Sequence, residues 1–183
     1  KKELDACNTL SNINGENVKV ILLSSAGSEG LDFKFIRQIH ILEPWYNINR
    51  IEQIIGRGIR TCSHKDLPFS ERNVKVYMHG SILKDKTIET ADLLIYRKAE
   101  EKAKLIGNVS RVLKEVSIDC HLNHELTKFS SENLKNNDVK LVLSNNEIVE
   151  YKIGDKPNSI LCDYMESCDY KCYPEVKDLE YDK

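Results

Sequence analysis

One short stretch carries more information than any other part of this chain: Gln53-Ile54-Ile55-Gly56-Arg57-Gly58-Ile59-Arg60. On a helix, its polar residues and its first glycine would recur at i, i+3, i+4 and i+7 and share one face. The members of this face are Gln53, Gly56, Arg57 and Arg60. The opposite face would anchor the helix to a core through four isoleucines, which are Ile51, Ile54, Ile55 and Ile59.

Two arginines on one rigid element suit a phosphate group, because each guanidinium offers a planar fork of donors that stays charged. A solvated cationic helix face is the plainer interpretation. Gly56 and Gly58 argue against it, since each glycine costs a helix interior about 1 kcal/mol relative to alanine. The pattern therefore favours a helix whose backbone is closely approached by a ligand.

Composition places the chain among ordinary globular proteins. Of its 183 residues, 40% are hydrophobic and 31% are charged, and the net charge is −2. No apolar run approaches the roughly 20 residues of a membrane helix, and the start shows no signal-peptide pattern. We expect a soluble protein of the cytoplasm, and a disulfide framework is unexpected there.

Helix and strand patterns alternate along the first two thirds of the chain. We expect a strand buried on both faces at residues 18–24, further strands at 38–42 and 74–79, and a long helix at about 87–116. Asn49, with Glu52 three positions later, resembles a capping box at the start of the arginine helix. This order predicts an α/β fold with a parallel sheet.

The sequence pattern changes beyond residue 118, where the helical periodicity ends. Residues 139–151 read as a β-hairpin that turns at Asn145-Asn146, and the last stretch is rich in cysteine, tyrosine and acid. We expect one domain at residues 1–119 and a C-terminal extension at 120–183. The abrupt start suggests the C-terminal piece of a longer protein.

The loop at residues 24–33 is the second candidate for function. Its small residues would let backbone N–H groups approach an anion, and Gly30 would permit the closest approach. Asp32 could accept a hydrogen bond from a ribose hydroxyl or hold an arginine, or it could simply cap a helix. Because ligands of open parallel sheets sit beyond the carboxyl ends of the strands, we expect this loop and the arginine helix at that edge.

These two segments resemble motifs of the superfamily 2 helicases and translocases. Ser24-Ser25-Ala26-Gly27-Ser28-Glu29-Gly30-Leu31-Asp32 is similar to motif V, and residues 53–60 match the motif VI pattern Q-x-x-G-R-x-x-R. Pro44-Trp45-Tyr46-Asn47 is similar to the segment before motif VI in chromatin-remodeller-type ATPases. The wider pattern, up to Val116-Ser117-Ile118-Asp119-Cys120, most resembles the helicase-like transcription ATPases of large cytoplasmic DNA viruses.

The resemblance implies a motor in which ATP with Mg²⁺ lies between two RecA-like lobes, this chain being part of the second. Arg60 would be the arginine finger that reaches the γ-phosphate, and Arg57 would assist it. Gln53, Gly56, Gly30 and Asp32 would lie at the nucleotide, with Asp32 near the ribose. Ser24 and Ser25 would face the nucleic-acid backbone.

The resemblance also implies partners outside this chain. They are nucleic acid, DNA rather than RNA, the first lobe of the same protein, and RNA polymerase or transcription factors, in a virus factory or virion if the protein is viral. The sequence contains no G-x-x-x-x-G-K-S/T loop and no acidic pair for magnesium, so this chain alone is not expected to hydrolyse ATP. A non-catalytic scaffold and a cellular RNA helicase or restriction-type motor stay open as alternatives.

The C-terminal cysteines form a further candidate site. Cys162, Cys168 and Cys172 lie close together, with Cys120 upstream as a fourth thiol and His121 and His124 beside it. Zinc takes four sulfur or nitrogen ligands, so these residues could form a zinc site. Reduced cysteines in a partly buried tail are the alternative.

Three aromatic positions need less explanation. Trp45 and Tyr46 could stack on a base, but packing is the favoured interpretation, and His40 inside a strand is read as structural. The helix at 87–116 mixes lysines with glutamates and reads as a solvated or partner-facing helix.

Overall fold

The computed structural model describes residues 2–24, 30–85, 87–127, 129, 134 and 138–175. Residue contacts divide the chain into two units, one comprising Lys1–Ala99 and Val139–Tyr151, the other Glu100–Asp138 and Lys152–Lys183. The boundary predicted at residue 119 separates parts that would fold independently. A division by residue contacts does not test independent folding, so this boundary stays a prediction. Within the described residues, no helix is both long and apolar enough to cross a lipid bilayer.

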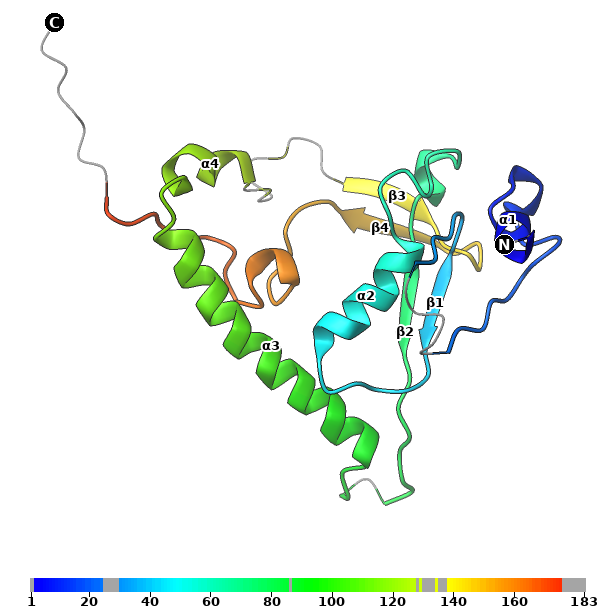
Figure 1. Cartoon of the computed structure of the whole chain (residues 1–183), viewed down its shortest axis with the longest axis horizontal. Helices are drawn as coiled ribbons and strands as arrows, with labels where there is room; N and C mark the ends of the chain where they lie inside the picture. The colour runs from blue at the N-terminus through cyan, green and yellow to red at the C-terminus, as the bar shows by residue number, and fades with distance from the viewer. Residues whose placement is uncertain are drawn as a thin grey trace, which may run out of the picture. The chain divides into compact units, whose positions relative to one another are not determined.

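The first unit is built on a parallel strand pair with a helix between its strands. β1 (Gln38–Ile41) pairs with β2 (Lys75–Met78) in the register Gln38↔Lys75 to Ile41↔Met78. α2 (Ile48–Gly58) connects them and lies alongside the pair (Figure 1). This arrangement confirms the predicted α/β class and the strands expected near residues 38–42 and 74–79.

The strand predicted at residues 18–24 is absent. Asn12 accepts hydrogen bonds from the backbone of Asn17 (2.9 Å) and Val18 (2.7 Å) and so fixes the start of this segment. Beyond that point the segment pairs with no strand among the described residues, and the Leu22 side chain is 87% exposed. A strand in a parallel sheet needs neighbours for its N–H and C=O groups, and within the described part of the chain β1 and β2 pair only with each other.

Two short helical elements precede that segment: α1 (Lys2–Cys7) and the 3₁₀ turn η1 (Leu10–Asn12). The 3₁₀ turn η3 (Phe69–Glu71) precedes β2. The predicted hairpin is confirmed as β3 (Asp138–Val142) and β4 (Ile148–Lys152), and Asn146 takes the positive φ of 64° that its turn requires. Arg37 and Asn73 bind the hairpin to the rest of the first unit by donating to the carbonyl of Val142 at 2.6 and 3.2 Å.

The second unit packs the C-terminal segment, residues 160–175, against α3 (Ala91–Glu115) and α4 (Cys120–Thr127). α3 confirms the predicted long helix, and η4 (Ile160–Cys162) opens the segment. The approach is close, because a Cβ on Gly107 would overlap the carbonyl oxygen of Asp163. Apolar side chains elsewhere on α3 are exposed, among them Leu105, Val109, Val112 and Leu113.

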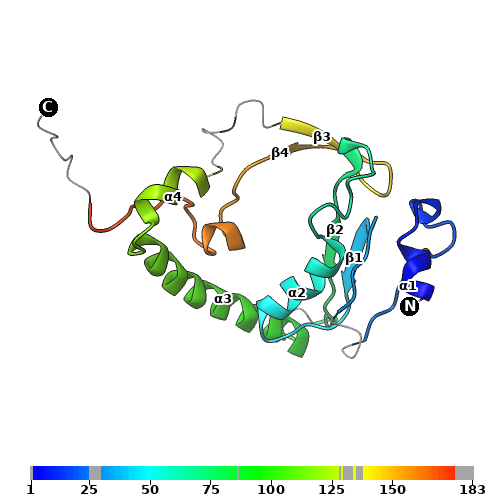
Figure 2. The same ribbon diagram turned by 45° about the horizontal axis from the view of Figure 1, so that its top comes forward.

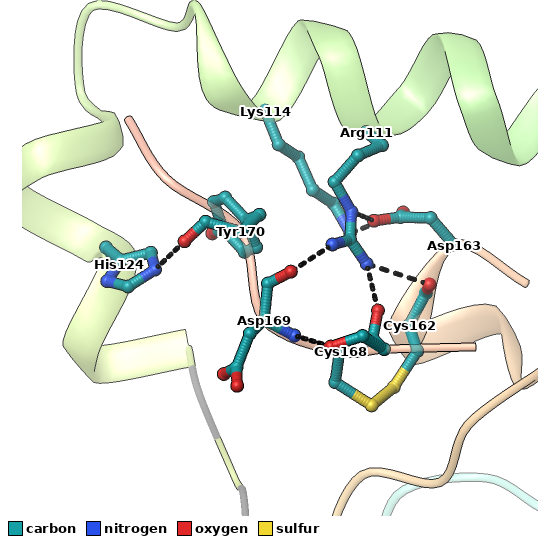
Figure 3. A network of polar contacts seen from close by, with 9 residues as sticks. Arg111, Lys114, His124, Cys162, Asp163, Cys168, Asp169 and Tyr170 are labelled. Atoms are coloured by element: carbon teal, nitrogen blue, oxygen red, sulfur yellow. Dashed lines mark hydrogen bonds and ion pairs between the residues drawn. A yellow bond between two sulfur atoms is a disulfide. The ribbon is translucent and has the colours of Figure 1, made fainter. Parts of the chain in front are cut away.

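Arg111 of α3 is the centre of this packing (Figure 3). Its Nε donates to Asp163 at 2.9 Å, and its two terminal nitrogens donate to three backbone carbonyls of the segment at 2.8–3.1 Å. Lys114 adds a second cation to Asp163, with Nζ 2.6 Å from the other carboxylate oxygen. A buried arginine is stable here because each of its three guanidinium nitrogens donates to at least one acceptor.

Candidate functional site

α2 begins two residues earlier than the capping-box pattern predicts. Asn47 is the N-cap, since its side chain accepts a hydrogen bond from the backbone N–H of Asn49 at 3.1 Å. The predicted cap at Asn49 is therefore wrong, because it lies inside the first turn. Ile51 is buried as expected, whereas Ile59 follows the last helical residue and is exposed.

The two glycines of α2 have different surroundings. A Cβ on Gly58 would lie 3.1 Å from the Ile39 side chain and 3.2 Å from that of Ile36, so this glycine lets the helix pack closely on β1 and on the segment just before it. Among the residues that the structure describes, a Cβ on Gly56 would meet nothing within 4 Å. Close approach by a ligand is thus the wrong explanation for Gly58, which packs on Ile36 and Ile39. Of the two glycines, only Gly56 leaves the helix backbone accessible to a ligand within the described part of the chain.

Arg60 does not share a helix face with Gln53, Gly56 and Arg57 as predicted, because α2 ends at Gly58. The chain nevertheless brings Arg60 to the loop that the sequence singled out. Its Nε lies 3.3 Å from the Oδ1 of Asp32, and the two side chains are 44% and 57% exposed. Of the roles considered for Asp32, holding an arginine is the one that this contact shows.

Backbone hydrogen bonds hold the two segments together. Phe33 donates to the carbonyl of Arg57 at 3.2 Å, and Phe35 donates to the carbonyl of Ser63 at 3.3 Å. Asn8 fixes the loop from its other side, donating to the carbonyl of Asp32 (2.9 Å) and accepting from the N–H of Lys34 (2.8 Å). Hydrogen bonds therefore fix the backbone on both sides of the Asp32–Arg60 pair.

The pair lies at the amino end of β1, not beyond the carboxyl ends of the strands as predicted. Residues 32–36 come just before β1, and they contact the residues that end and follow α2. The reason is geometric: a helix that joins two parallel strands runs back along the sheet, so its last turn returns to the end where the first strand began (Figures 1 and 2).

The electrostatics of the pair favour exchange of partners. A half-exposed ion pair contributes about 0–1 kcal/mol, so Arg60 can leave Asp32 for a phosphate at small cost. Within the described residues, the buried Nε of Arg57 has no hydrogen-bond partner. Gly30 has the positive φ of 75° that suits glycine, and a Cβ added to it would meet none of the described residues within 4 Å.

The remaining predicted residues are less constrained. Gln53 and Ser24 are exposed, and Ser25 lies outside the described residues. Trp45 and Tyr46 are exposed on the surface, so packing in a core is wrong for them, although the guanidinium of Arg50 lies 4.0 Å from the Trp45 ring centre. His40 stacks on Tyr77 of the neighbouring strand at 4.6 Å, which agrees with its structural interpretation.

Sequence reasoning missed Ser63 and His64. Ser63 is buried and accepts from the backbone N–H of Arg60 at 3.2 Å, while its hydroxyl lies 2.7 Å from Nδ1 of His64. The Nε2 of His64 lies 2.7 Å from the carbonyl oxygen of Ile36. Both residues directly follow the arginine pattern, but the helical period stops at Gly58 and no local signal marks a turn that folds back onto residue 36.

The predicted zinc site is not supported. Cys162 is joined to Cys168 and Cys120 to Cys172, so the four thiols form two disulfides and the expectation against disulfides is also wrong. His121 and His124 contact the backbone carbonyls of Pro174 and Tyr170. Among the described residues, no group of three potential ligands is placed to hold a metal.

Comparison with known proteins agrees with this arrangement. Residues 3–62, which include the Asp32–Arg60 pair, match the model of the helicase conserved C-terminal domain. Residues 3–62 belong to a superfamily 2 helicase C-terminal domain. The helicase domain thus covers α1, the small-residue loop, β1 and α2.

Similar proteins are found in large DNA viruses, as the resemblance implied. A mimivirus protein named as an ATP-dependent RNA helicase is 41% identical over 124 residues, which are 64% of this chain and 15% of the relative. A protein of Invertebrate iridescent virus 3 named as a helicase is 33% identical across 100% of the chain and 16% of its own length. A termination factor NPH-I homolog of African swine fever virus is 34% identical over 64% of the chain and 18% of its own length.

These relatives are far longer than the chain studied. The chain spans between 15% and 18% of the length of the three proteins described. The matched region is therefore a small part of a longer protein in each relative.

Proposed function

We propose that this chain supplies the second-lobe side of the ATP site in a helicase or translocase. Arg60 is the arginine finger, Arg57 assists it, and Gly30, Asp32, Gln53 and Gly56 lie at the nucleotide. The observation that carries the proposal is the Asp32–Arg60 pair, because two segments that resemble motifs V and VI meet at one guanidinium. The first lobe would hold the magnesium and the remaining phosphate contacts.

The arrangement of these residues suits a finger that changes partner. In the chain itself the cation of Arg60 is neutralised by Asp32, and the pair is half exposed. When ATP lies against the second lobe, the γ-phosphate is the stronger partner, because it carries more negative charge than a carboxylate and offers one more acceptor oxygen. The guanidinium would then stabilise the charge that spreads over the transferring phosphoryl group.

We further propose that the motor acts in transcription on DNA in the cytoplasm, with RNA polymerase or its factors as partners. A relative named as a termination factor supports this context, and other relatives named as RNA helicases support RNA as the substrate instead. Stimulation of ATP turnover by DNA and by RNA of equal length would decide between the two substrates. Ser24 and Ser25 are proposed to face the nucleic-acid backbone.

The test of the finger is Arg60→Ala in the intact protein that contains both lobes. We expect ATP binding to stay close to the wild-type value while nucleic-acid-stimulated turnover falls by about 10³-fold or more. Arg50→Ala is the matched control, since Arg50 lies on the same helix but contacts Trp45 at the opposite end, and it should keep wild-type turnover. Wild-type turnover in Arg60→Ala would reject the finger, and an intact protein without any turnover would favour a scaffold.

A further inference from the structure

A continuous series of hydrogen bonds ties the turn after α2 to Ile36, two residues before β1. The backbone N–H of Arg60 donates to Ser63 Oγ at 3.2 Å, Ser63 Oγ lies 2.7 Å from His64 Nδ1, and His64 Nε2 lies 2.7 Å from the carbonyl oxygen of Ile36. Ser63 is 5% exposed, so its hydroxyl depends on protein partners.

Chemistry assigns a direction to every bond of this series. The Ile36 carbonyl can only accept, so the hydrogen of a neutral His64 ring sits on Nε2. Nδ1 is then an acceptor and takes the hydroxyl hydrogen of Ser63. The lone pairs of Ser63 Oγ remain for the N–H of Arg60. Each group uses the role that its neighbour requires, and the series has one consistent arrangement for a neutral imidazole.

The backbone of Arg60 depends on this series of hydrogen bonds, because Arg60 lies beyond the end of α2 and makes no helical hydrogen bond through its N–H. The C-cap Ile59 makes the last helical bond, to the carbonyl of Ile55, and the N–H of Arg60 turns to Ser63 instead. A second tie runs in parallel, from the N–H of Phe35 to the carbonyl of Ser63. The backbone of Arg60 is thereby held against residues 35 and 36, a few residues from Asp32 in the same loop.

We propose that Ser63 and His64 are positioning residues for Arg60. They hold its backbone at a set place relative to the loop that carries Asp32, so that the guanidinium has a short and reproducible path from carboxylate to phosphate. This inference rests on the proposed role of Arg60 as the finger. A role limited to stabilising the turn is the alternative, and the experiments below separate the two.

The first experiment measures amide hydrogen exchange in the 183-residue chain. We expect His64→Ala and Ser63→Ala to raise the exchange rate at Arg60 about 3- to 10-fold, the equivalent of one hydrogen bond. His64→Gln can still donate from the ε position, and His64→Asn can still accept at the δ position, so each should restore part of the protection. Lys65→Ala is the control and should leave exchange at Arg60 unchanged. Unchanged exchange in His64→Ala would overturn the proposal, and unchanged protection of the paired strands β1 and β2 verifies that the first unit, which carries the substitution, is folded.

The second experiment is a double-mutant cycle in the intact two-lobe protein. We expect His64→Ala to lower kcat about 10- to 100-fold with little change in KM for ATP. The reason is that a misplaced arginine finger stabilises the transition state less but changes the binding of ATP little. In an Arg60→Ala background, the same substitution should change kcat by less than about twofold, since the group that it positions is gone. An equal loss in both backgrounds would overturn the positioning role in favour of a merely structural one. If Arg60→Ala itself keeps full turnover, the proposed function fails, and the exchange experiment still decides whether His64 holds the backbone of Arg60.

Discussion

At the scale of single residues, identical amino acids in one helix serve different purposes. Gly58 is needed because Ile36 and Ile39 occupy the space where its side chain would be, whereas Gly56 faces open space. The sequence could not separate these cases, since both glycines lower the helix propensity of the segment by the same amount. Only the position of β1 relative to the helix distinguishes a packing glycine from one that leaves the backbone accessible.

This difference predicts opposite effects on stability. We expect Gly58→Ala to lower the free energy of unfolding of the 183-residue chain by about 1–3 kcal/mol, because the new methyl group overpacks the contact with Ile36 and Ile39. Gly56→Ala should leave it unchanged or raise it by up to about 1 kcal/mol through higher helix propensity. Urea titration followed by circular dichroism measures both values. Equal destabilisation by the two substitutions would contradict the packing of α2 described above.

At the scale of elements, α2 and α3 position their arginines in different ways. α2 delivers Arg60 to an exposed pair just beyond its end, which suits a residue that must change partners. α3 holds Arg111 in a buried set of acceptors on the C-terminal segment, which suits a residue that stays in place (Figure 3). Periodicity predicted both helices, but the partner of each arginine lies far away in the sequence and followed from the tertiary structure.

Removal of Arg111 should therefore be costly. We expect Arg111→Ala to lower the free energy of unfolding by about 3–5 kcal/mol, because the buried carboxylate of Asp163 loses a partner and three carbonyls lose their donor. Lys104→Ala is the control on the same helix: its exposed pair with Glu100 should change stability by less than about 0.5 kcal/mol. The two variants are compared by chemical denaturation, and similar losses would argue against the Arg111 network.

At the scale of the whole molecule, covalent links add to the packing of the second unit. The bond between Cys120 and Cys172 spans 52 residues, and the one between Cys162 and Cys168 spans 6. Cys7 and Cys62 are free thiols. The dispersed cysteines gave no local sign of this pairing, because which sulfurs meet depends on how the C-terminal segment folds back on α3 and α4.

The pairing predicts a defined thiol count. We expect the oxidised chain, alkylated in denaturant without reductant, to carry two labels by mass spectrometry, on Cys7 and Cys62, and six after reduction. Loss of the longer cross-link in Cys172→Ser should destabilise the chain by about 4 kcal/mol, and loss of the shorter one in Cys168→Ser by about 2 kcal/mol, if chain entropy dominates. Six labels without reduction would show that the bonds are absent.

The sequence by itself determined the local parts of this protein. Periodicity predicted α2 and α3, alternation and turn residues predicted the hairpin, and the resemblance of two segments to motifs V and VI implied the helicase lobe. Such features depend on residues a few positions apart, where side-chain spacing and backbone propensity act directly. The wrong cap has a local cause, because two nearby asparagines compete for the position. The missing strand at residues 18–24 has a non-local one, because an apolar run does not reveal whether neighbouring strands are present.

Tertiary structure alone decided how those parts meet. It joined Arg60 to Asp32, moved the site to the amino end of β1, filled the space beside Gly58 and paired the cysteines. Each of these contacts joins residues that are distant along the chain, and none leaves a periodic trace in the sequence. The Ser63–His64 series of hydrogen bonds belongs to the same class, because the turn after α2 can be recognised as functional only once Ile36 is seen beside it.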